Sequence, residues 1–142
     1  MFRTLDATIL VAPQIDCDAV AEAAAQGVTL IVNNRPEGES FDQVAGDEIA
    51  AAAAAAGLDY VAIPITHAGF SQVQVDAMAA ALAGAKGKTL AYCRSGTRST
   101  LLWALARACQ GDDPQMLAEK ATHAGYDLSP IAEMLDMLSG HK

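Results

Sequence analysis

A cysteine and an arginine with four residues between them follow directly after an apolar run. The run is KTLAY at residues 88–92, and Cys-Arg-Ser-Gly-Thr-Arg-Ser follows it at residues 93–99. A loop between a strand and a helix points successive backbone N–H groups at one spot, and the positive end of the helix dipole adds to them. Such a loop binds anions and favours the thiolate form of a cysteine. Cys93 is therefore a candidate nucleophile, and Arg98 a candidate ligand for two oxygens of an anionic substrate.

The remaining residues of this loop have predicted supporting roles. Gly96 permits the backbone angles that such a loop requires. Ser99 can cap the helix that follows, or assist in the breakdown of a covalent intermediate on Cys93. Arg94 can place a second positive charge at the entrance of the anion-binding loop. The predicted anion-binding residues are Arg94, Ser95, Gly96, Thr97 and, from another loop, Arg35.

Two further loops follow predicted strands and should open on the same rim as Cys93. In RPEGE, at residues 35–39, Arg35 is a candidate for anion binding and Glu39 for holding an arginine in place; a surface ion pair without a function is the open alternative. In ITHAGFS, at residues 65–71, His67 is a candidate general acid, against the alternative of a surface histidine.

Composition limits the class of protein. The 142 residues suit one domain, expected over residues 1–142, and no apolar run approaches the ~20 residues that span a bilayer. A net charge of -8 argues against nucleic acid as a partner. No secretory leader is recognisable in the first dozen residues, so we expect a cytoplasmic protein that does not bind membranes.

The cysteines predict neither a disulfide framework nor a metal centre. Cys17, Cys93 and Cys109 are odd in number, form no CxxC pair and have no histidine at metal-ligand spacing. We expect Cys17 and Cys109 to be buried structural residues, since free cysteines are commonly buried. No cofactor and no metal are expected.

Hydrophobic periodicity and turn residues predict an α/β fold, with a mostly parallel four- to five-stranded sheet flanked by helices. The β-branched run at residues 28–32 lacks polar alternation, which is typical of a strand covered on both faces. The expected strands are residues 8–11, 28–32, 59–64 and 88–93, and the expected helices are residues 17–25, 41–56, 72–85, 99–110, 114–124 and 130–138.

Three segments carry a resemblance to a known family. TLIVNNRPEGE at residues 29–39, YVAIPIT at 60–66 and YCRSGTRSTLLWALA at 92–106 together resemble the phosphatase-like domain of the bacterial beta-lactamase hydrolase-like proteins. The resemblance implies the fold of the cysteine-dependent, dual-specificity phosphatases. Family members are described as phosphatase-like hydrolases or as sulfur transferases. Phosphatase loops carry five residues between cysteine and arginine, whereas rhodanese sulfurtransferase loops commonly carry four, as this chain does.

Two departures from phosphatases bear on the reaction. Tyr92 replaces the usual histidine before the nucleophile, and residues 65–71 contain no carboxylate to protonate a leaving oxygen. Loss of a general acid costs a phosphatase on the order of 10²–10⁴ in rate, whereas sulfane-sulfur transfer needs none. We therefore expect sulfur transfer through a Cys93 persulfide. The alternatives are a phosphatase that forms a phosphocysteine and a non-catalytic anion-binding module. The expected partner is a small anion (persulfide, thiosulfate or phosphoester), and the oligomeric state stays open.

Overall fold

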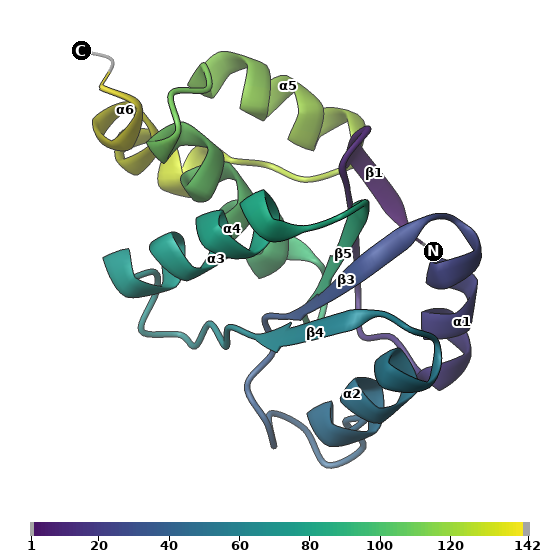
Figure 1. Cartoon of the computed structure of the whole chain (residues 1–142). Coiled ribbons are helices and arrows are strands. Elements are labelled where there is room, and N and C mark those ends of the chain that lie inside the picture. Colours follow the sequence, from purple (N-terminus) through teal and green to yellow (C-terminus); the bar gives the residue numbers. More distant parts are fainter. Residues whose placement is uncertain (1, 141–142) are drawn as a thin grey trace.

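A five-stranded sheet organises the molecule (Figure 1). The structure, a computed structural model, describes residues 2–140. The order across the sheet is β1-β2-β5-β3-β4, in which β1 pairs antiparallel with β2 and the other pairs are parallel. The predicted fold class is therefore confirmed. The strands are β1 (Arg3–Asp6), β2 (Ile9–Ala12), β3 (Val28–Asn33), β4 (Asp59–Ala62) and β5 (Lys88–Tyr92).

Strand β1 is the element that the sequence pattern does not predict. Its four residues carry Arg3 and Asp6, and Leu5 alone among them is buried. A short, charged strand of this kind is typical of a sheet edge, where one side of the ladder faces solvent. The central strands show the opposite pattern, because helices cover both of their faces. Residues of β2 are buried throughout, as are those of β5 after Lys88.

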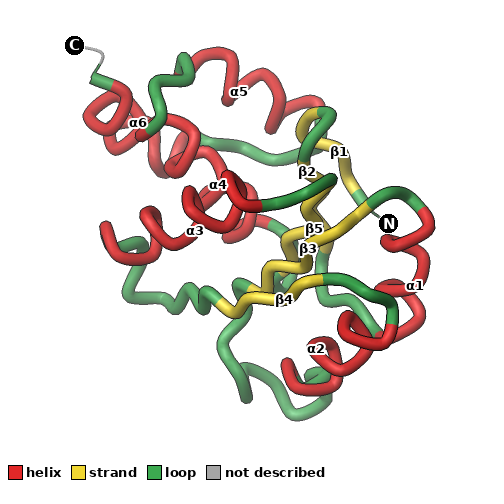
Figure 2. The backbone as a smooth tube through the Cα atoms, in the orientation of Figure 1, coloured by secondary structure: helices red, strands yellow, loops and turns green. Residues whose placement is uncertain are grey.

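Helices cover both faces of the sheet (Figure 2). Helices α1 and α2 pack on one face, and α3, α4, α5 and α6 lie on the other. None of the helices in residues 2–140 is long and apolar enough to cross a membrane. The helices are α1 (Cys17–Ala25), α2 (Gly46–Ala55), α3 (Gln72–Gly84), α4 (Thr97–Cys109), α5 (Pro114–His123) and α6 (Ala132–Ser139), the last after a 3-10 turn at Ser129–Ile131.

Helix α2 begins five residues later than the sequence predicts. Residues 41–45 form a turn and an extended segment in which Phe41 is fully exposed, so they belong to the loop after β3. The carboxylate of Glu37 accepts the N–H of Gly46 at 2.9 Å and thereby caps the helix. The start of α2 is thus set by a side chain nine residues away, which helix propensity does not reveal.

The sheet register places the loops of the site side by side. Tyr92 of β5 pairs with Asn33 of β3 on one side and with Ala12 of β2 on the other. The pairing continues past the strand ends, because the N–H of Asn34 donates to the carbonyl of Tyr92 at 2.8 Å. The loops after β2, β3 and β5 therefore leave the same edge of the sheet, where ligands bind in open α/β sheets.

Candidate active site

The loop between β5 and α4 closes around the sulfur of Cys93. Cys93 follows β5 directly and is fully buried. The N–H of Gly96 donates to its Sγ at 3.1 Å. Below this contact, Thr100 Oγ1 donates to the carbonyl of Gly96 at 2.9 Å and ties the loop to the first turn of α4. Cys93 therefore lies at the positive end of α4, as the sequence predicts.

Gly96 is required where it stands. Its φ of 90° lies in the left-handed region, where residues with a side chain are strained. A Cβ at this position would also collide with the hydroxyl of Tyr126. That hydroxyl donates to the carbonyl of Ser95 at 3.1 Å, so Tyr126 holds the loop from outside.

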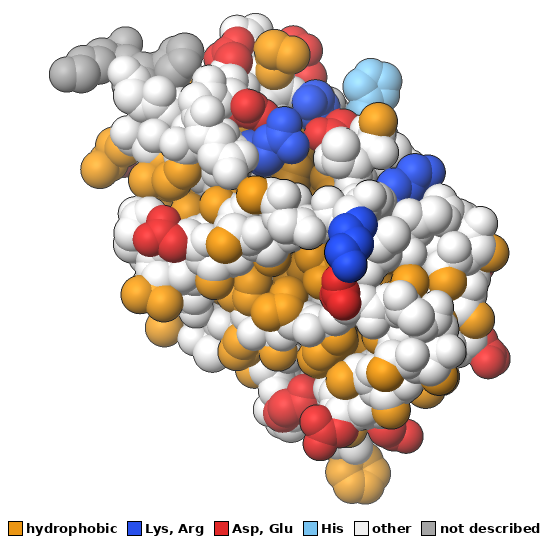
Figure 3. Space-filling model, in the orientation of Figure 1, with side chains coloured by type: hydrophobic (Ala, Val, Ile, Leu, Met, Phe, Trp, Pro, Cys, Tyr) orange, Lys and Arg blue, Asp and Glu red, His pale blue; other side chains and the backbone are white. Residues whose placement is uncertain are grey.

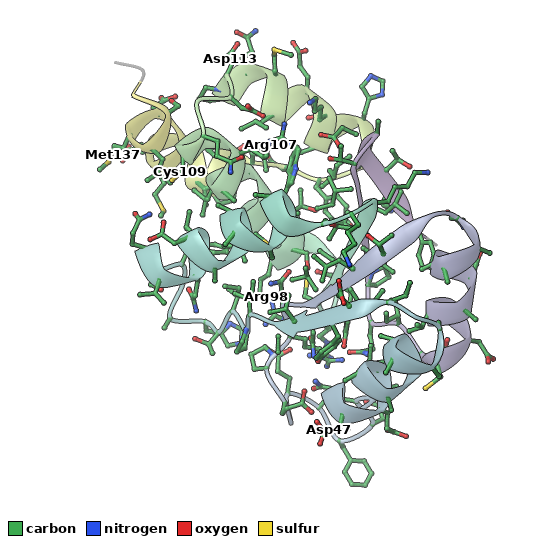
Figure 4. All side chains as sticks on the ribbon, viewed as in Figure 1. Asp47, Arg98, Arg107, Cys109, Asp113 and Met137 are labelled. Atoms are coloured by element: carbon green, nitrogen blue, oxygen red, sulfur yellow. The ribbon has the colours of Figure 1, made fainter. Side chains whose placement is uncertain are left out.

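Arg98 is clamped by a carboxylate from another loop. Its Nη1 and Nη2 donate to the two oxygens of Glu39 at 2.7 and 2.8 Å. Nη1 also donates to the carbonyl of Ile65 at 2.7 Å, which places Arg98 beyond the end of β4 (Figure 4). Hydrogen bonding to Glu39 raises the pKa of Arg98, and the side chain of Cys93 contributes in the same direction. The structure thus brings Cys93, Arg98 and Glu39 together.

Arg35 binds the same carboxylate and holds it in place. Its side chain is 4% exposed, and its Nε donates to Glu39 at 3.0 Å. Its Nη1 donates to Gln14 at 2.9 Å and its Nη2 to Ser40 at 3.0 Å. All three guanidinium nitrogens are engaged with the protein. Of the roles expected for this loop, the geometry fits best with Glu39 holding an arginine in place.

Glu39 is fixed in its ionised form. Hydrogen bonding to Arg98, followed by that to Arg35, lowers its pKa from 4.5 to about 2 against the opposing effect of burial. At neutral pH the group holds no proton that it could give to a leaving group. The carboxylate bound to Arg98 therefore cannot replace the general acid that residues 65–71 lack.

The outer residues of the Cys93 loop face solvent. Arg94, Ser95 and Thr97 are exposed. Ser95 Oγ donates to Thr97 Oγ1 at 3.0 Å, which stiffens the turn, and the carbonyl of Arg94 accepts the N–H of Gln14 at 3.2 Å. Within residues 2–140, the side chain of Arg94 has no hydrogen bond or ion pair. Its charge acts on a nearby carboxylate, because it adds to the hydrogen bond of Ser40 in lowering the pKa of Asp42.

Two other predicted residues occupy different environments. Ser99 is fully buried at the start of α4, and its Oγ has no hydrogen-bond partner in the described part of the chain. His67 is exposed in a turn of the loop after β4. The structure brings the backbone of this loop to Arg98 through Ile65, but it shows no bond from His67 to the site. Asp76, on α3, is exposed and accepts a hydrogen bond from Gln72 at 2.8 Å.

The expectation for the other cysteines is wrong. Cys17 and Cys109 are both exposed, because each lies at an end of its helix where the surface turns outward. Cys109 lies at the opposite end of α4 from Arg98 (Figure 4). Tyr92, in the position before Cys93, is buried, and burial raises its pKa, with the neighbouring Tyr60 adding to the effect. Its hydroxyl therefore stays protonated.

The sequence prediction misses four residues that contact the site. Gln14 and Ser40 complete the contacts of Arg35, and the carbonyl of Ile65 completes those of Arg98. Tyr126 contacts the loop from a segment more than 25 residues away in sequence. Gln14 follows β2 and Ser40 lies in the loop after β3, so their position at the carboxyl edge of the sheet was an available signal. No comparable signal marks Tyr126.

Comparison with known proteins identifies the family and the fold. The family model of the beta-lactamase hydrolase-like protein, phosphatase-like domain, matches residues 1–110. A beta-lactamase hydrolase-like protein of Xylella fastidiosa is 32% identical over 129 residues, which make up 90% of this chain and 30% of that protein. The chain thus spans less than a third of the length of the curated relatives that it matches.

Solved structures extend the comparison. A “putative phosphatase” from Neisseria meningitidis is 29% identical, covers 96% of both chains and superimposes with a TM-score of 0.83. Tk-PTP in its active form shares the fold at 16% identity, with a TM-score of 0.74 and coverage of 99% of this chain and 97% of that chain. These similarities bear out the predicted cysteine-dependent phosphatase fold. This chain belongs to the family of phosphatase-like domains of the beta-lactamase hydrolase-like proteins.

Proposed function

We propose that this chain transfers sulfane sulfur through a persulfide on Cys93. The observation that carries the proposal is the state of Glu39. This carboxylate is bound by Arg98 and Arg35, and its pKa is lowered to about 2 by these hydrogen bonds. The site therefore favours a reaction whose leaving group departs as a stable anion and needs no proton.

Sulfur transfer from thiosulfate meets this condition. The Cys93 thiolate attacks the outer sulfur, the S–S bond of thiosulfate breaks, and sulfite leaves with the bonding electron pair. Cys93 then carries a persulfide. A nucleophilic acceptor such as cyanide attacks the outer sulfur of this persulfide, thiocyanate leaves, and the thiolate of Cys93 is restored. Neither step consumes or releases a proton, and neither requires an oxidant or a reductant.

The loop geometry suits this intermediate. The N–H of Gly96 lies 3.1 Å from Sγ, and Arg98 is held next to the sulfur by the Glu39 clamp. Backbone N–H groups and a guanidinium fixed before the reaction stabilise developing negative charge without reorganising. Four residues between Cys93 and Arg98 leave a smaller enclosure than the five of a phosphatase loop. We infer that one extra sulfur fits this enclosure better than a whole phosphate does.

Hydrolysis of a phosphoester is the second candidate. The chain has the phosphatase-like fold, and the buried hydroxyl of Ser99 is free to assist in the breakdown of a phosphocysteine on Cys93. Two more distant neighbours of the same fold have been solved with small anions: PTPMT1 with PI(5)P, and the core catalytic domain of the PP-IP phosphatase SIW14 from S. cerevisiae with citrate. A small anionic ligand is common to both candidates.

Two assays run in parallel separate these candidates. Wild type and Cys93→Ser are incubated with thiosulfate and cyanide, and separately with an aryl phosphate. The proposal predicts thiocyanate formation that is lost in Cys93→Ser, and a mass increase of one sulfur on the peptide that contains Cys93. Phosphate release that depends on Cys93, without thiocyanate, would replace sulfur transfer by the second candidate. Activity in neither assay, together with no sulfur on Cys93, would indicate an anion-binding module.

The exposed cysteines supply the matched control. Cys17 and Cys109 can take up sulfur without catalysis because they are accessible to solvent. The double variant Cys17→Ser/Cys109→Ser should keep the full rate of thiocyanate formation. Loss of the rate in this variant would show that the sulfur passes through a surface cysteine rather than through Cys93.

A further inference from the structure

A pocket of about 530 Å³ adjoins the Cys93 loop. Its lining includes Ser95 of the loop, Arg3 of β1, and Tyr126 with Gly125 from the segment after α5. Phe2 and Pro13 complete the wall. Its volume lies within the range of pockets that bind small organic molecules. A single inorganic anion at Cys93 would leave this space unused.

The pocket is coupled to the loop by direct contact. The hydroxyl of Tyr126 donates to the carbonyl of Ser95 at 3.1 Å, and it lies where a side chain on residue 96 would be. Ser95 is two residues from Cys93, so their Cα atoms are at most about 7 Å apart. Burial raises the pKa of the Tyr126 hydroxyl, Arg3 opposes this rise, and Cys93 adds to it. The pocket therefore borders the loop that carries Cys93.

Arg3 gives the pocket an uncompensated positive charge. Its guanidinium lies 6.0 Å from the centre of the Tyr126 ring, and its Nη1 donates to the carbonyl of Ala124 at 2.9 Å. Among the described residues, Arg3 has no acidic partner, whereas Arg35, Arg98 and Arg107 each have one. Arg94 is the other arginine without an ion pair among the described residues, and it does not line this pocket. The Nε and Nη2 of Arg3 remain available to an anion.

We infer that this pocket holds the distal part of the substrate, and that Arg3 binds a carboxylate on it. The substrate is accordingly a small organic sulfur donor with an anionic tail, rather than a bare inorganic anion. The flat faces of Tyr126 and Pro13 suit the body of such a molecule. The inference rests on the proposed function in one respect, namely that Cys93 carries the reacting sulfur. Tyr126 and Gly125 lie beyond the residues that the family model matches.

The kinetic test compares two donors that differ only in the carboxylate. With cyanide as acceptor, kcat/KM is measured for benzenethiosulfonate and for para-carboxybenzenethiosulfonate; each loses its outer sulfur to Cys93 and departs as an arenesulfinate. Wild type should prefer the carboxylated donor. Arg3→Gln should lower the ratio of the two kcat/KM values by about fivefold, the upper end for an exposed ion pair. An unchanged ratio in Arg3→Gln, or no preference in wild type, overturns the inference.

Lys88→Gln is the matched control. Lys88 is exposed, and its substitution removes one positive charge, as Arg3→Gln does. Lys88 begins β5 and therefore lies at the edge of the sheet opposite Cys93. The donor ratio should equal that of wild type. If Lys88→Gln lowers the ratio as much as Arg3→Gln does, the preference reflects net charge and the pocket has no part in it.

A binding test decides the inference without turnover. Cys93→Ser is titrated with para-sulfobenzoate and with benzenesulfonate, and the backbone amide NMR signals of Ser95, Gly125 and Tyr126 are followed. The carboxylated ligand should bind about fivefold more tightly and shift these three signals. Equal affinity, or shifts elsewhere, refutes the pocket. This outcome does not depend on whether Cys93 transfers sulfur or attacks phosphorus, nor on the folding of an Arg3 variant.

Discussion

Replacing Glu39 by glutamine tests the clamp that holds Arg98. Glu39 is 16% exposed and Arg98 is 20% exposed, so both charges are largely withdrawn from water. The hydrogen bonds of Arg98 and Arg35 lower the pKa of Glu39 from 4.5 to about 2. At about 1.4 kcal/mol per pKa unit this amounts to roughly 3 kcal/mol. Residual solvent contact reduces the effect, so we expect Glu39→Gln to lower the free energy of unfolding at neutral pH by about 2 kcal/mol.

The stabilising effect of Glu39 depends on pH. The pKa of Glu39 is lower in the folded than in the unfolded protein, so the carboxylate contributes its full stability above about pH 5. That contribution is lost as the pH falls toward about pH 2, because protonation breaks the bonds to Arg98 and Arg35. Glutamine cannot titrate. In Glu39→Gln the free energy of unfolding should therefore fall less steeply across this window than in wild type.

Urea unfolding followed by circular dichroism, repeated across this pH window, measures both effects. Glu48→Gln is the control, because Glu48 is exposed on the first turn of α2 and has no ion pair among the described residues. Its free energy of unfolding should stay within ~1 kcal/mol of that of wild type, because only the interaction of an exposed carboxylate with the helix dipole is lost. The clamp should also matter for activity, with kcat/KM for thiosulfate about tenfold lower in Glu39→Gln because Arg98 is no longer oriented. An acid dependence in Glu39→Gln as steep as that of wild type would refute the reasoning.

Three further substitutions test other parts of the site. Gly96→Ala should lower the free energy of unfolding by roughly 2–4 kcal/mol in urea, because the left-handed φ and the hydroxyl of Tyr126 both exclude a side chain. Ser99→Ala should change it by less than about 1 kcal/mol, because no protein partner is lost, and leave kcat for thiocyanate formation unchanged, because the sulfur-transfer steps do not use Ser99. Asp16→Ala should cost about 1 kcal/mol in the same unfolding experiment, through loss of the cap on Ala19, and leave kcat/KM unchanged.

The local part of the site could be predicted from sequence. Cys93, Gly96 and Arg98 lie within six residues, and a buried strand followed by a helix allows one arrangement of the loop between them. The contact between Glu39 and Arg98 spans 59 residues but was still within reach of prediction. Glu39 lies in the loop after β3 and Arg98 in the first turn of α4, directly after β5. Because β3 and β5 are neighbours and both run to the same edge of the sheet, the α/β pattern already brings the two segments together.

The non-local part could not be predicted. Arg3 belongs to a four-residue edge strand whose pattern carries no alternation, and Tyr126 follows α5 in a segment without a motif. Their contact depends on how α5 packs against β1, which is a tertiary property. The distribution of charge on the surface is also a tertiary property. In Figure 3 the basic side chains lie in the upper and middle parts of the face, and acidic side chains lie at the lower end. A net charge of -8 cannot reveal such a distribution.

The charges around Cys93 limit which leaving groups a reaction at this cysteine can expel. Arg35, Arg98 and Glu39 together carry one net positive charge, which can balance one anionic sulfur on Cys93. Hydrogen bonding lowers the pKa of Glu39 and raises that of Arg98, so neither can donate a proton near neutral pH. A leaving group must therefore depart as a stable anion, as sulfite does, or take its proton from water. Phosphate esters of acidic phenols also meet this condition, because a phenolate is a stable anion, whereas alkyl phosphate esters do not. Because Glu39 and Arg98 supply no proton, we expect the rate of any reaction at Cys93 to increase with the acidity of the leaving group.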